Sequence, residues 1–294
     1  MADLSVSRST PDPSQIASQL DRRVYKLISP SQRHYYRSGL QSPESFWLLH
    51  GNKIVTGSVI GICVAGFAAN GYAKYLAQRT RDYKLLEFIR RNFVSSLENV
   101  KAGRWWVMAT SSVMHTNWIH LGCNMWALWS IGPFAMSYFR VTQFLGLWLV
   151  SAVSCSAASL YWTHFKEELR REKAVGRTSD SHPRPQWTRY INLGSGNSME
   201  YYGGAVGASG SLSGLFTTMM CIMPRVRVSV FPITFVSFPL WLGNAFFATG
   251  SAYCMVTGAI PLISHAGHLG GLAGGLVYYL GVIRPFLRIR GRRV

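Results

Sequence analysis

The sequence predicts an all-α polytopic membrane protein, and two observations support this prediction. Apolar residues make up 48% of the 294-residue chain and charged residues only 14%, and the charges fall between long apolar stretches rather than within them. A helix needs roughly 20 mostly apolar residues to cross a bilayer. Six stretches meet this requirement, at about residues 54–73, 118–138, 142–162, 205–223, 230–250 and 263–283. We therefore predict one domain, a bundle of six transmembrane helices over residues 52–285.

The segments outside the predicted spans are polar. Residues 1–51 are rich in Ser and Arg and lack the apolar core of a secretory signal peptide, so they form either a mitochondrial transit peptide or a disordered tail. Residues 163–204 are rich in Gly, Ser and Arg without periodicity, which predicts a flexible insertion. Residues 286–294 form a basic C-terminal tail. Arginines in this tail and in the short loops at 140 and 225–227 place both termini on the positive side of the membrane.

Two further segments lie between the first and second spans. Residues 82–97 alternate apolar and basic side chains, which is typical of an amphipathic helix lying on the bilayer surface. The stretch from Trp105 to Met114 is apolar but too short to cross. We expect it to enter the membrane interface or to pack on the bundle.

The net charge of +18 raises the question of a nucleic-acid partner. The basic residues are spread over the tail, the loops and the C-terminus, without the interleaved aromatic residues of a single-strand-binding surface. Anionic lipid is the expected partner, and no nucleic acid is expected. The five cysteines are widely spaced in apolar stretches, which favours neither a disulfide framework nor a zinc site. We expect no metal and no cofactor.

The fourth span begins with a candidate nucleophile. Ser209 lies between Gly207 and Gly210 at the predicted start of a helix, where free backbone N–H groups and the positive end of the helix dipole gather. The two glycines allow unusual backbone angles and a close approach of a ligand. Ser211 and Ser213 are rival hydroxyls, but neither has Gly two residues before it and one after it.

The sixth span carries a candidate base. His268 is followed by Gly271 and Gly275, and small residues at intervals of four let helices touch backbone to backbone. Close packing against the fourth span would bring His268 within hydrogen-bond reach of Ser209, as an activated nucleophile requires. His265 lies near the same face but lacks the downstream glycine spacing.

The second span adds a polar pair. His120 and Asn124 are four residues apart and so share one helix face. A lone buried His is usually a structural group, and such a pair can simply join two helices. Here this polar face coincides with the polar faces that carry Ser209 and His268, which favours a functional site.

These motifs together resemble the rhomboid family of intramembrane serine proteases. The resemblance covers residues 52–285 and rests on His115, His120-Leu-Gly-Cys-Asn124, Gly207-Ala-Ser209-Gly210 and His268-Leu-Gly-Gly271-Leu-Ala-Gly-Gly275. Gly103-Arg-Trp-Trp106 and Asn124-Met-Trp-Ala-Leu-Trp129 look most like the mitochondrial, presenilin-associated branch.

The resemblance implies a six-helix fold in which Ser209 attacks a peptide carbonyl and His268 acts as general base and then acid. It also implies that His120 and Asn124 supply the oxyanion hole, that the substrate is a transmembrane helix, and that the protein resides in the mitochondrial inner membrane. The residues themselves favour a dyad, because no Asp or Glu follows Glu200 and none lies inside a predicted span. This chain differs from the family at Val107, where Arg is common, and at Ser213, where an aromatic residue is common.

Three other functions fit parts of the pattern. A catalytically silent rhomboid-like protein that binds membrane clients would normally lack Ser209 or His268, and both are present. A transporter would usually show repeats or interrupted helices in corresponding halves, and we find no such symmetry. A zinc hydrolase is disfavoured because no Glu accompanies His265 and His268.

Overall fold

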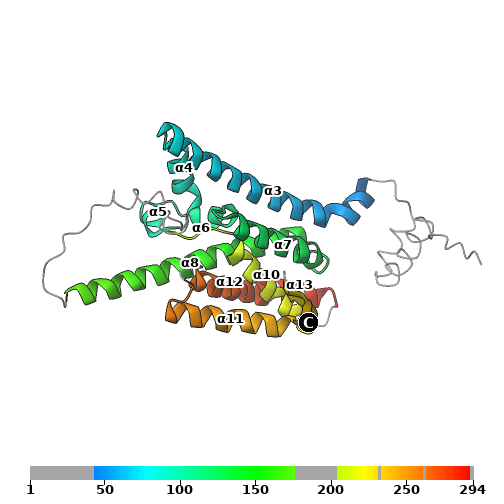
Figure 1. Ribbon diagram of the computed structural model, residues 1–294. Helices are drawn as coiled ribbons and strands as arrows, with labels where there is room; N and C mark the ends of the chain where they lie inside the picture. The colour runs from blue at the N-terminus through cyan, green and yellow to red at the C-terminus, as the bar shows by residue number, and fades with distance from the viewer. Residues whose placement is uncertain (1–42, 176–203, 231–232, 261–262, 292–294) are drawn as a thin grey trace, which may run out of the picture. The chain divides into compact units, whose positions relative to one another are not determined.

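The computed structural model describes residues 43–175, 204–230, 233–260 and 263–291 (Figure 1). Most of the predicted N-terminal tail, at residues 1–42, and most of the predicted insertion, at residues 176–203, lie outside these ranges. The chain divides into two units between Gly51 and Asn52, and the second unit contains the helix bundle.

Six helices of the described part correspond to the predicted spans. They are α3 (Pro43–Thr80), α7 (Trp118–Ala135), α8 (Val141–Val175), α10 (Ser209–Ile222), α11 (Leu240–Thr257) and α12 (His265–Tyr278). Among the described residues, three helical stretches are long and apolar enough to cross a membrane by themselves: His50–Thr80, Val141–Leu169 and His265–Ile289. The last stretch joins α12 to α13 (Arg284–Ile289) through a short π-helix, Tyr279–Ile283, so the predicted basic tail begins within a continuous helix. The predicted all-α multi-pass membrane fold is confirmed.

The prediction of a fifth span at 230–250 is wrong in its boundaries. The chain instead forms an antiparallel hairpin of β1 (Arg227–Val230) and β2 (Ile233–Pro239), and α11 begins only at Leu240. Alternating β-branched residues favour strands here. Pro239 has extended backbone angles, φ −61° and ψ 142°, and precedes the first helical residue. At its other end, α11 continues beyond the predicted end of the span, as far as Thr257.

The third span also extends beyond its predicted end. Helix α8 continues to Val175, into the segment predicted as a flexible insertion. The residues after Thr163 are rich in Glu, Lys and Arg, which are strong helix formers. His164 and Glu168 lie 3.5 Å apart at the helical spacing of four residues.

Four short elements connect α3 to α7: α4 (Lys84–Phe93), α5 (Leu97–Lys101), α6 (Val107–Thr110) and a 3₁₀ turn, η1 (Ser111–Val113). Helix α4 is the predicted amphipathic helix, but it does not present its whole apolar face to a bilayer. Leu86 and Ile89 are buried in a cluster that includes Ala73 of α3 and Val206. The stretch from Trp105 to Met114 packs on the bundle, because Ser156 of α8 donates a hydrogen bond of 2.9 Å to the carbonyl of Met108.

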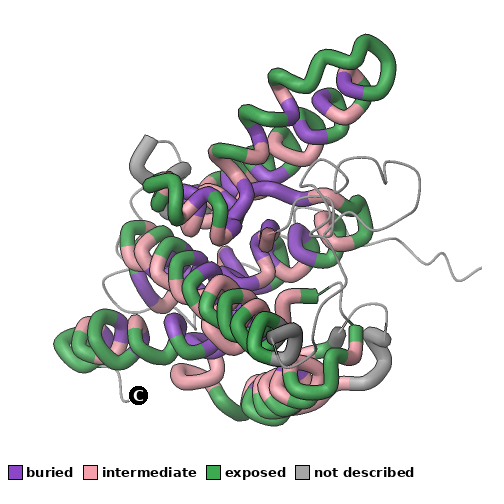
Figure 2. Tube along the Cα trace, turned by 90° about the vertical axis from the view of Figure 1, so that its left-hand side faces the viewer, coloured by how far each residue is buried: buried purple, intermediate pink, exposed green. Residues whose placement is uncertain are grey.

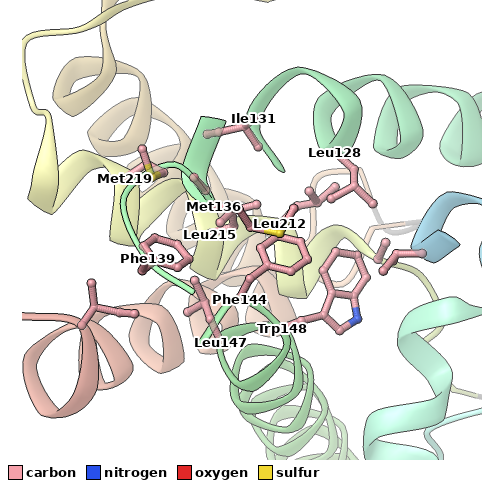
Figure 3. Packing of buried hydrophobic residues seen from close by; sticks show 14 of the residues in the cluster. Leu128, Ile131, Met136, Phe139, Phe144, Leu147, Trp148, Leu212, Leu215 and Met219 are labelled. Atoms are coloured by element: carbon pink, nitrogen blue, oxygen red, sulfur yellow. The ribbon is translucent and has the colours of Figure 1, made fainter. Parts of the chain in front are cut away.

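The bundle centres on α12. It contacts α8, α10 and α11, and Figure 1 shows α12 between α8 and α11. Buried residues lie on the sides of the helices that face one another, and exposed residues lie on the outer sides (Figure 2). In the apolar core, Phe144, Leu147 and Trp148 of α8 pack beside Leu212 and Leu215 of α10 (Figure 3).

Candidate active site

Ser209 and His268 lie within hydrogen-bond distance of each other. Ser209 Oγ is 3.0 Å from His268 Nε2, although the two residues are 59 positions apart. Both side chains are half-buried. A serine hydroxyl at this distance from an imidazole nitrogen has the geometry of a nucleophile and its general base.

The start of α10 places the Ser209 hydroxyl at a helix N-terminus. Gly207 has a φ of +126°, a value that side-chain-bearing residues rarely adopt, and a Cβ there would run into the His120 ring. Ala208 is the N-cap and makes no side-chain cap, and α10 begins at Ser209, which is the helix start that the sequence predicts within the apolar stretch 205–223. The backbone N–H groups of the first helical turn have no partner within the helix. They are therefore free to bind an anion or a developing negative charge beside Ser209.

The start of α12 is fixed by a side-chain cap. Ser264 accepts a hydrogen bond from the N–H of Gly267, and its own hydroxyl donates to Ser159 of α8 at 2.8 Å. The N–H of His268 then donates to the carbonyl of Ser264 at 3.0 Å, closing the first turn. These bonds fix the position of His268 along the axis of α12 relative to α8.

Backbone contact between α10 and α12 sets the distance between the two side chains. A Cβ added to Gly271 would overlap the backbone of Gly210, and one added to Gly275 would overlap the backbone of Gly214. Thr218 adds a hydrogen bond of 3.1 Å to the carbonyl of Gly275. Only glycine lets the helices approach this closely.

His120 and Asn124 both face the residues that precede Ser209. The His120 ring packs against Gly207, and Asn124 is buried. The Asn124 amide donates to His115 Nε2 at 3.1 Å, and the N–H of Ala208 donates to the same nitrogen at 3.3 Å. Because both partners are N–H donors, Nε2 carries no proton, and neutral His115 is protonated at Nδ1. His115 thus links Asn124 to the backbone beside the serine.

Residues 204–208 are also held by the segment between α4 and α7. Ser95 and Ala205 exchange two backbone hydrogen bonds, of 3.1 and 2.9 Å. The N–H of Gly207 donates to the carbonyl of Ser111 at 2.9 Å. Together with His115, these bonds fix the approach of the chain to Ser209 at three points.

The other candidate hydroxyls, Ser211 and Ser213, and the other candidate base, His265, have partners elsewhere. The Ser211 hydroxyl donates to the carbonyl of Trp148 at 2.9 Å, and the Ser213 hydroxyl donates to the carbonyl of Ser209 at 2.7 Å. The His265 ring lies 6.3 Å from the His268 ring, centroid to centroid and at 89° to it, and its Nε2 is 3.2 Å from the carbonyl oxygen of Ile260.

Sequence reasoning gave one neighbour of the site no role and missed another. His115 enters the sequence prediction only as part of a motif, and its role depends on a turn that brings it to Ala208. Phe247 of α11 places its ring centroid 5.0 Å from that of His268. No local pattern marks Phe247, because the predicted fifth span begins too early to give the register of α11.

The segment between α3 and α7 is anchored although Val107 stands where Arg is common in the family. Val107 is fully buried. Trp106 donates to the Asn92 side chain at 3.2 Å, and Arg104 donates to the Asn99 side chain at 2.9 Å. The hydrogen bonds of Arg104 and Trp106 therefore hold this segment in place.

The arrangement suits acyl transfer. It combines a hydroxyl, an adjacent imidazole and unpaired N–H groups at a helix start. Within the described ranges, no group of three or more His, Cys, Asp or Glu residues is placed to hold a metal ion. No Asp or Glu follows Glu200. Helices α10, α11 and α12 therefore offer no carboxylate that could orient the His268 ring.

Residues 102–285 match a protein-family model described as the rhomboid domain. The chain is 23% identical over 257 residues to Rhomboid protein 1, mitochondrial, of Saccharomyces cerevisiae, which covers 86% of this chain and 60% of that protein. It is 24% identical over 127 residues to Rhomboid protease AarA of Providencia stuartii, covering 43% and 37% of the two chains. An uncharacterized mitochondrial rhomboid protein of Schizosaccharomyces pombe is 32% identical over 77 residues, which is 26% of this chain and 20% of the relative.

In each case the match spans less than two thirds of the curated relative's length. No solved structure matches the chain significantly.

Proposed function

The chain belongs to the rhomboid family, a family of intramembrane proteases, and we propose that it is an active serine endopeptidase that cleaves transmembrane helices through a dyad of Ser209 and His268. The observation that carries this proposal is the distance of 3.0 Å between Ser209 Oγ and His268 Nε2. The glycine contacts between α10 and α12 support it. They join backbone to backbone, so the distance does not depend on side chains that could change their conformation.

The proposed reaction follows from the positions of the groups. Ser209 Oγ attacks the peptide carbonyl carbon while His268 Nε2 takes the hydroxyl proton. The tetrahedral intermediate then collapses, the C–N bond breaks, and His268 returns the proton to the leaving amine. Water hydrolyses the resulting ester by the same two steps, which regenerates the Ser209 hydroxyl.

The negative charge on the intermediate needs hydrogen-bond donors. The N–H groups at the start of α10 are available on geometric grounds, and Asn124 keeps a second amide N–H beyond the one directed at His115. We assign His120 and Asn124 to the oxyanion hole together with the N–H of Ser209. Each such donor is worth about 3–4 kcal/mol of transition-state stabilisation in serine proteases.

The test is cleavage by the full chain reconstituted in vesicles, with a fluorescent transmembrane substrate and a serine-directed activity probe. Ser209→Ala is expected to abolish both cleavage and labelling. Ser211→Ala, on the same helix and with its hydroxyl committed to Trp148, is the matched control and is expected to retain both. Unchanged cleavage by Ser209→Ala contradicts the assignment. Client binding without cleavage by the wild type and Ser209→Ala alike indicates a silent binder.

We also propose a mitochondrial location, because two of the relatives carry that location in their names. A C-terminal fluorescent fusion that leaves the N-terminus free is expected to colocalise with a mitochondrial inner-membrane marker. A signal confined to another membrane contradicts this proposal.

Anionic lipid is the proposed partner at the basic end of the bundle. The guanidinium groups of Arg140 and Arg290 lie 5.6 and 4.7 Å from the ring centroid of Phe286. Among the described residues, neither arginine forms an ion pair with a carboxylate. Juxtamembrane arginines of this kind attract anionic headgroups by about 1 kcal/mol each. Anionic vesicles are therefore expected to raise the unfolding temperature of the wild type more than that of an Arg140→Gln, Arg290→Gln double variant.

A further inference from the structure

The imidazole of His268 has an aromatic neighbour on a third helix. The ring centroids of Phe247 and His268 are 5.0 Å apart and the ring planes are tilted by 38°. This separation lies within the range at which aromatic rings attract each other. The contact joins α11 to α12, so it depends on how these two helices pack against each other.

Among the described residues, the other groups near His268 do not fix the orientation of its ring. Ser209 contacts Nε2, which is the reacting nitrogen. Ser213, one turn further along α10, directs its hydroxyl to the carbonyl of Ser209. The His265 ring stands perpendicular to the His268 ring at 6.3 Å and belongs to the same helix. An imidazole without a carboxylate partner needs some other contact to fix its rotation about the Cβ–Cγ bond.

We propose that Phe247 is a positioning residue that holds the His268 imidazole in the orientation that directs Nε2 at Ser209. This inference rests on the proposed function of the dyad. Phe247 also stabilises the positive charge on His268 in the transition state, when His268 carries the proton taken from Ser209. A cation within about 6 Å of an aromatic ring is stabilised by the ring's electrons.

The neighbouring residue provides a control. Phe246 is 79% exposed on the outer surface of α11, whereas Phe247 is 39% exposed and contacts His268. The same substitution at the two positions changes the same side chain in the same helix. Only the change at Phe247 removes a ring from the site.

The first measurement is steady-state cleavage in vesicles by the wild type and by the variants Phe247→Leu, Phe247→Tyr and Phe246→Leu. Phe247→Leu is expected to lower kcat roughly 3- to 10-fold, the size of one aromatic pair, with little change in KM. Phe247→Tyr, which keeps the ring, is expected to stay within about 2-fold of the wild type. Phe246→Leu is expected to match the wild type, and thermal unfolding shows that each variant is folded.

The second measurement reports the contact itself. In protein labelled at histidine, the His268 Cε1–H resonance, assigned with a His268→Gln variant, is expected to carry a ring-current shift from Phe247. This shift disappears in Phe247→Leu and persists in Phe246→Leu.

The outcomes separate this inference from the proposed function. If the wild type cleaves and Phe247→Leu has the same kcat, or if Phe247→Tyr loses as much activity as Phe247→Leu, the positioning role is wrong and the dyad stands. If the wild type and Ser209→Ala are equally inactive, the protease proposal fails and the positioning role fails with it. A His268 resonance that Phe247→Leu leaves unmoved overturns the contact whatever the activity.

Discussion

The α10–α12 interface and the segment from Ser95 to His115 both border Ser209, but they are built from different chemistry. Gly210 and Gly271 meet backbone to backbone, and a side chain on Gly271 would collide with the neighbouring helix. The other segment acts through hydrogen bonds, which join Ser95 to Ala205 and Ser111 to Gly207. The interface therefore sets how far Ser209 is from His268, and the segment sets the direction from which the chain reaches Ser209. An interface of backbones tolerates no added atom, whereas a set of hydrogen bonds can lose one member.

The strongest test of this difference is Gly271→Ala. The added methyl meets the carbonyl group of Gly210, which is backbone and cannot rotate away. Overpacking of this kind typically costs about 1–3 kcal/mol. A misplacement of about 1 Å can lower the rate about 100-fold. We expect a loss of cleavage of that order and a lower unfolding temperature in micelles.

Gly61→Ala is the matched control for this variant. An added Cβ on Gly61 of α3 has no atom within 4 Å, and alanine is the better helix former by about 0.5–1 kcal/mol. The control is expected to keep full activity and to be as stable as the wild type or slightly more stable. Equal behaviour of the two variants would show that the α10–α12 interface is less tight than the structure indicates.

The two regions also differ in how far the sequence predicts them. Glycines spaced by four residues mark the faces of α10 and α12, because this period is local and independent of the rest of the fold. The contacts of the other segment are not local: His115 and Ala208 are 93 positions apart, and their meeting depends on the turn at Gly207. The sequence identified Ser209, His268, His120 and Asn124 as candidates by residue type and order, but it left Phe247 unmarked. The register of α11 depends on where the helix begins, and hydropathy alone does not separate a β-hairpin rich in β-branched residues from an apolar helix.

Asn99→Ala tests the hydrogen-bonded segment from Ser95 to His115. Buried Asn99 donates to the carbonyls of Arg90 and Val94 at 2.8 and 2.7 Å and accepts from Arg104 at 2.9 Å. Asn99→Ala removes these three buried hydrogen bonds, which costs about 1–3 kcal/mol. We expect a clear drop in unfolding temperature and faster hydrogen exchange over residues 94–104. The loss of cleavage is expected to be smaller than for Gly271→Ala, because the α10–α12 contact is intact.

Asn92→Ala is the comparison for this variant. Asn92 is half-buried, and its side chain bonds to Trp106 and to the carbonyl of Phe88 near the surface. Asn92→Ala is expected to lower the unfolding temperature less than Asn99→Ala does. An activity loss from Asn99→Ala as large as that from Gly271→Ala would mean that the segment, rather than the glycine interface, sets the distance between Ser209 and His268.

The smallest effect is expected at the outer edge of the same segment. Arg90 forms a two-pronged ion pair with Glu98, at 2.7 and 3.1 Å, but the Glu98 side chain is 62% exposed. Water screens such a pair, which limits it to about 0–1 kcal/mol. The hydrogen bond from Arg90 is the largest cause that holds the pKa of Glu98 below its ordinary value of 4.5. Because the folded state lowers this pKa, the pair stabilises the protein above pH 4.5, and the stabilisation is lost as the pH falls through the lowered pKa.

Glu98→Gln is therefore expected to unfold at a slightly lower temperature than the wild type at neutral pH. The difference is expected to vanish once the medium is acidic enough to protonate Glu98 in the folded wild type. Cleavage at neutral pH is expected to stay within about 2-fold of the wild type, because an exposed pair of this kind contributes little. A stability difference that persists in acid would assign the effect to the shape of the glutamate side chain rather than to its charge. A large loss of cleavage would mean that this surface pair, and not the buried bonds of Asn99, holds the segment against Ser209.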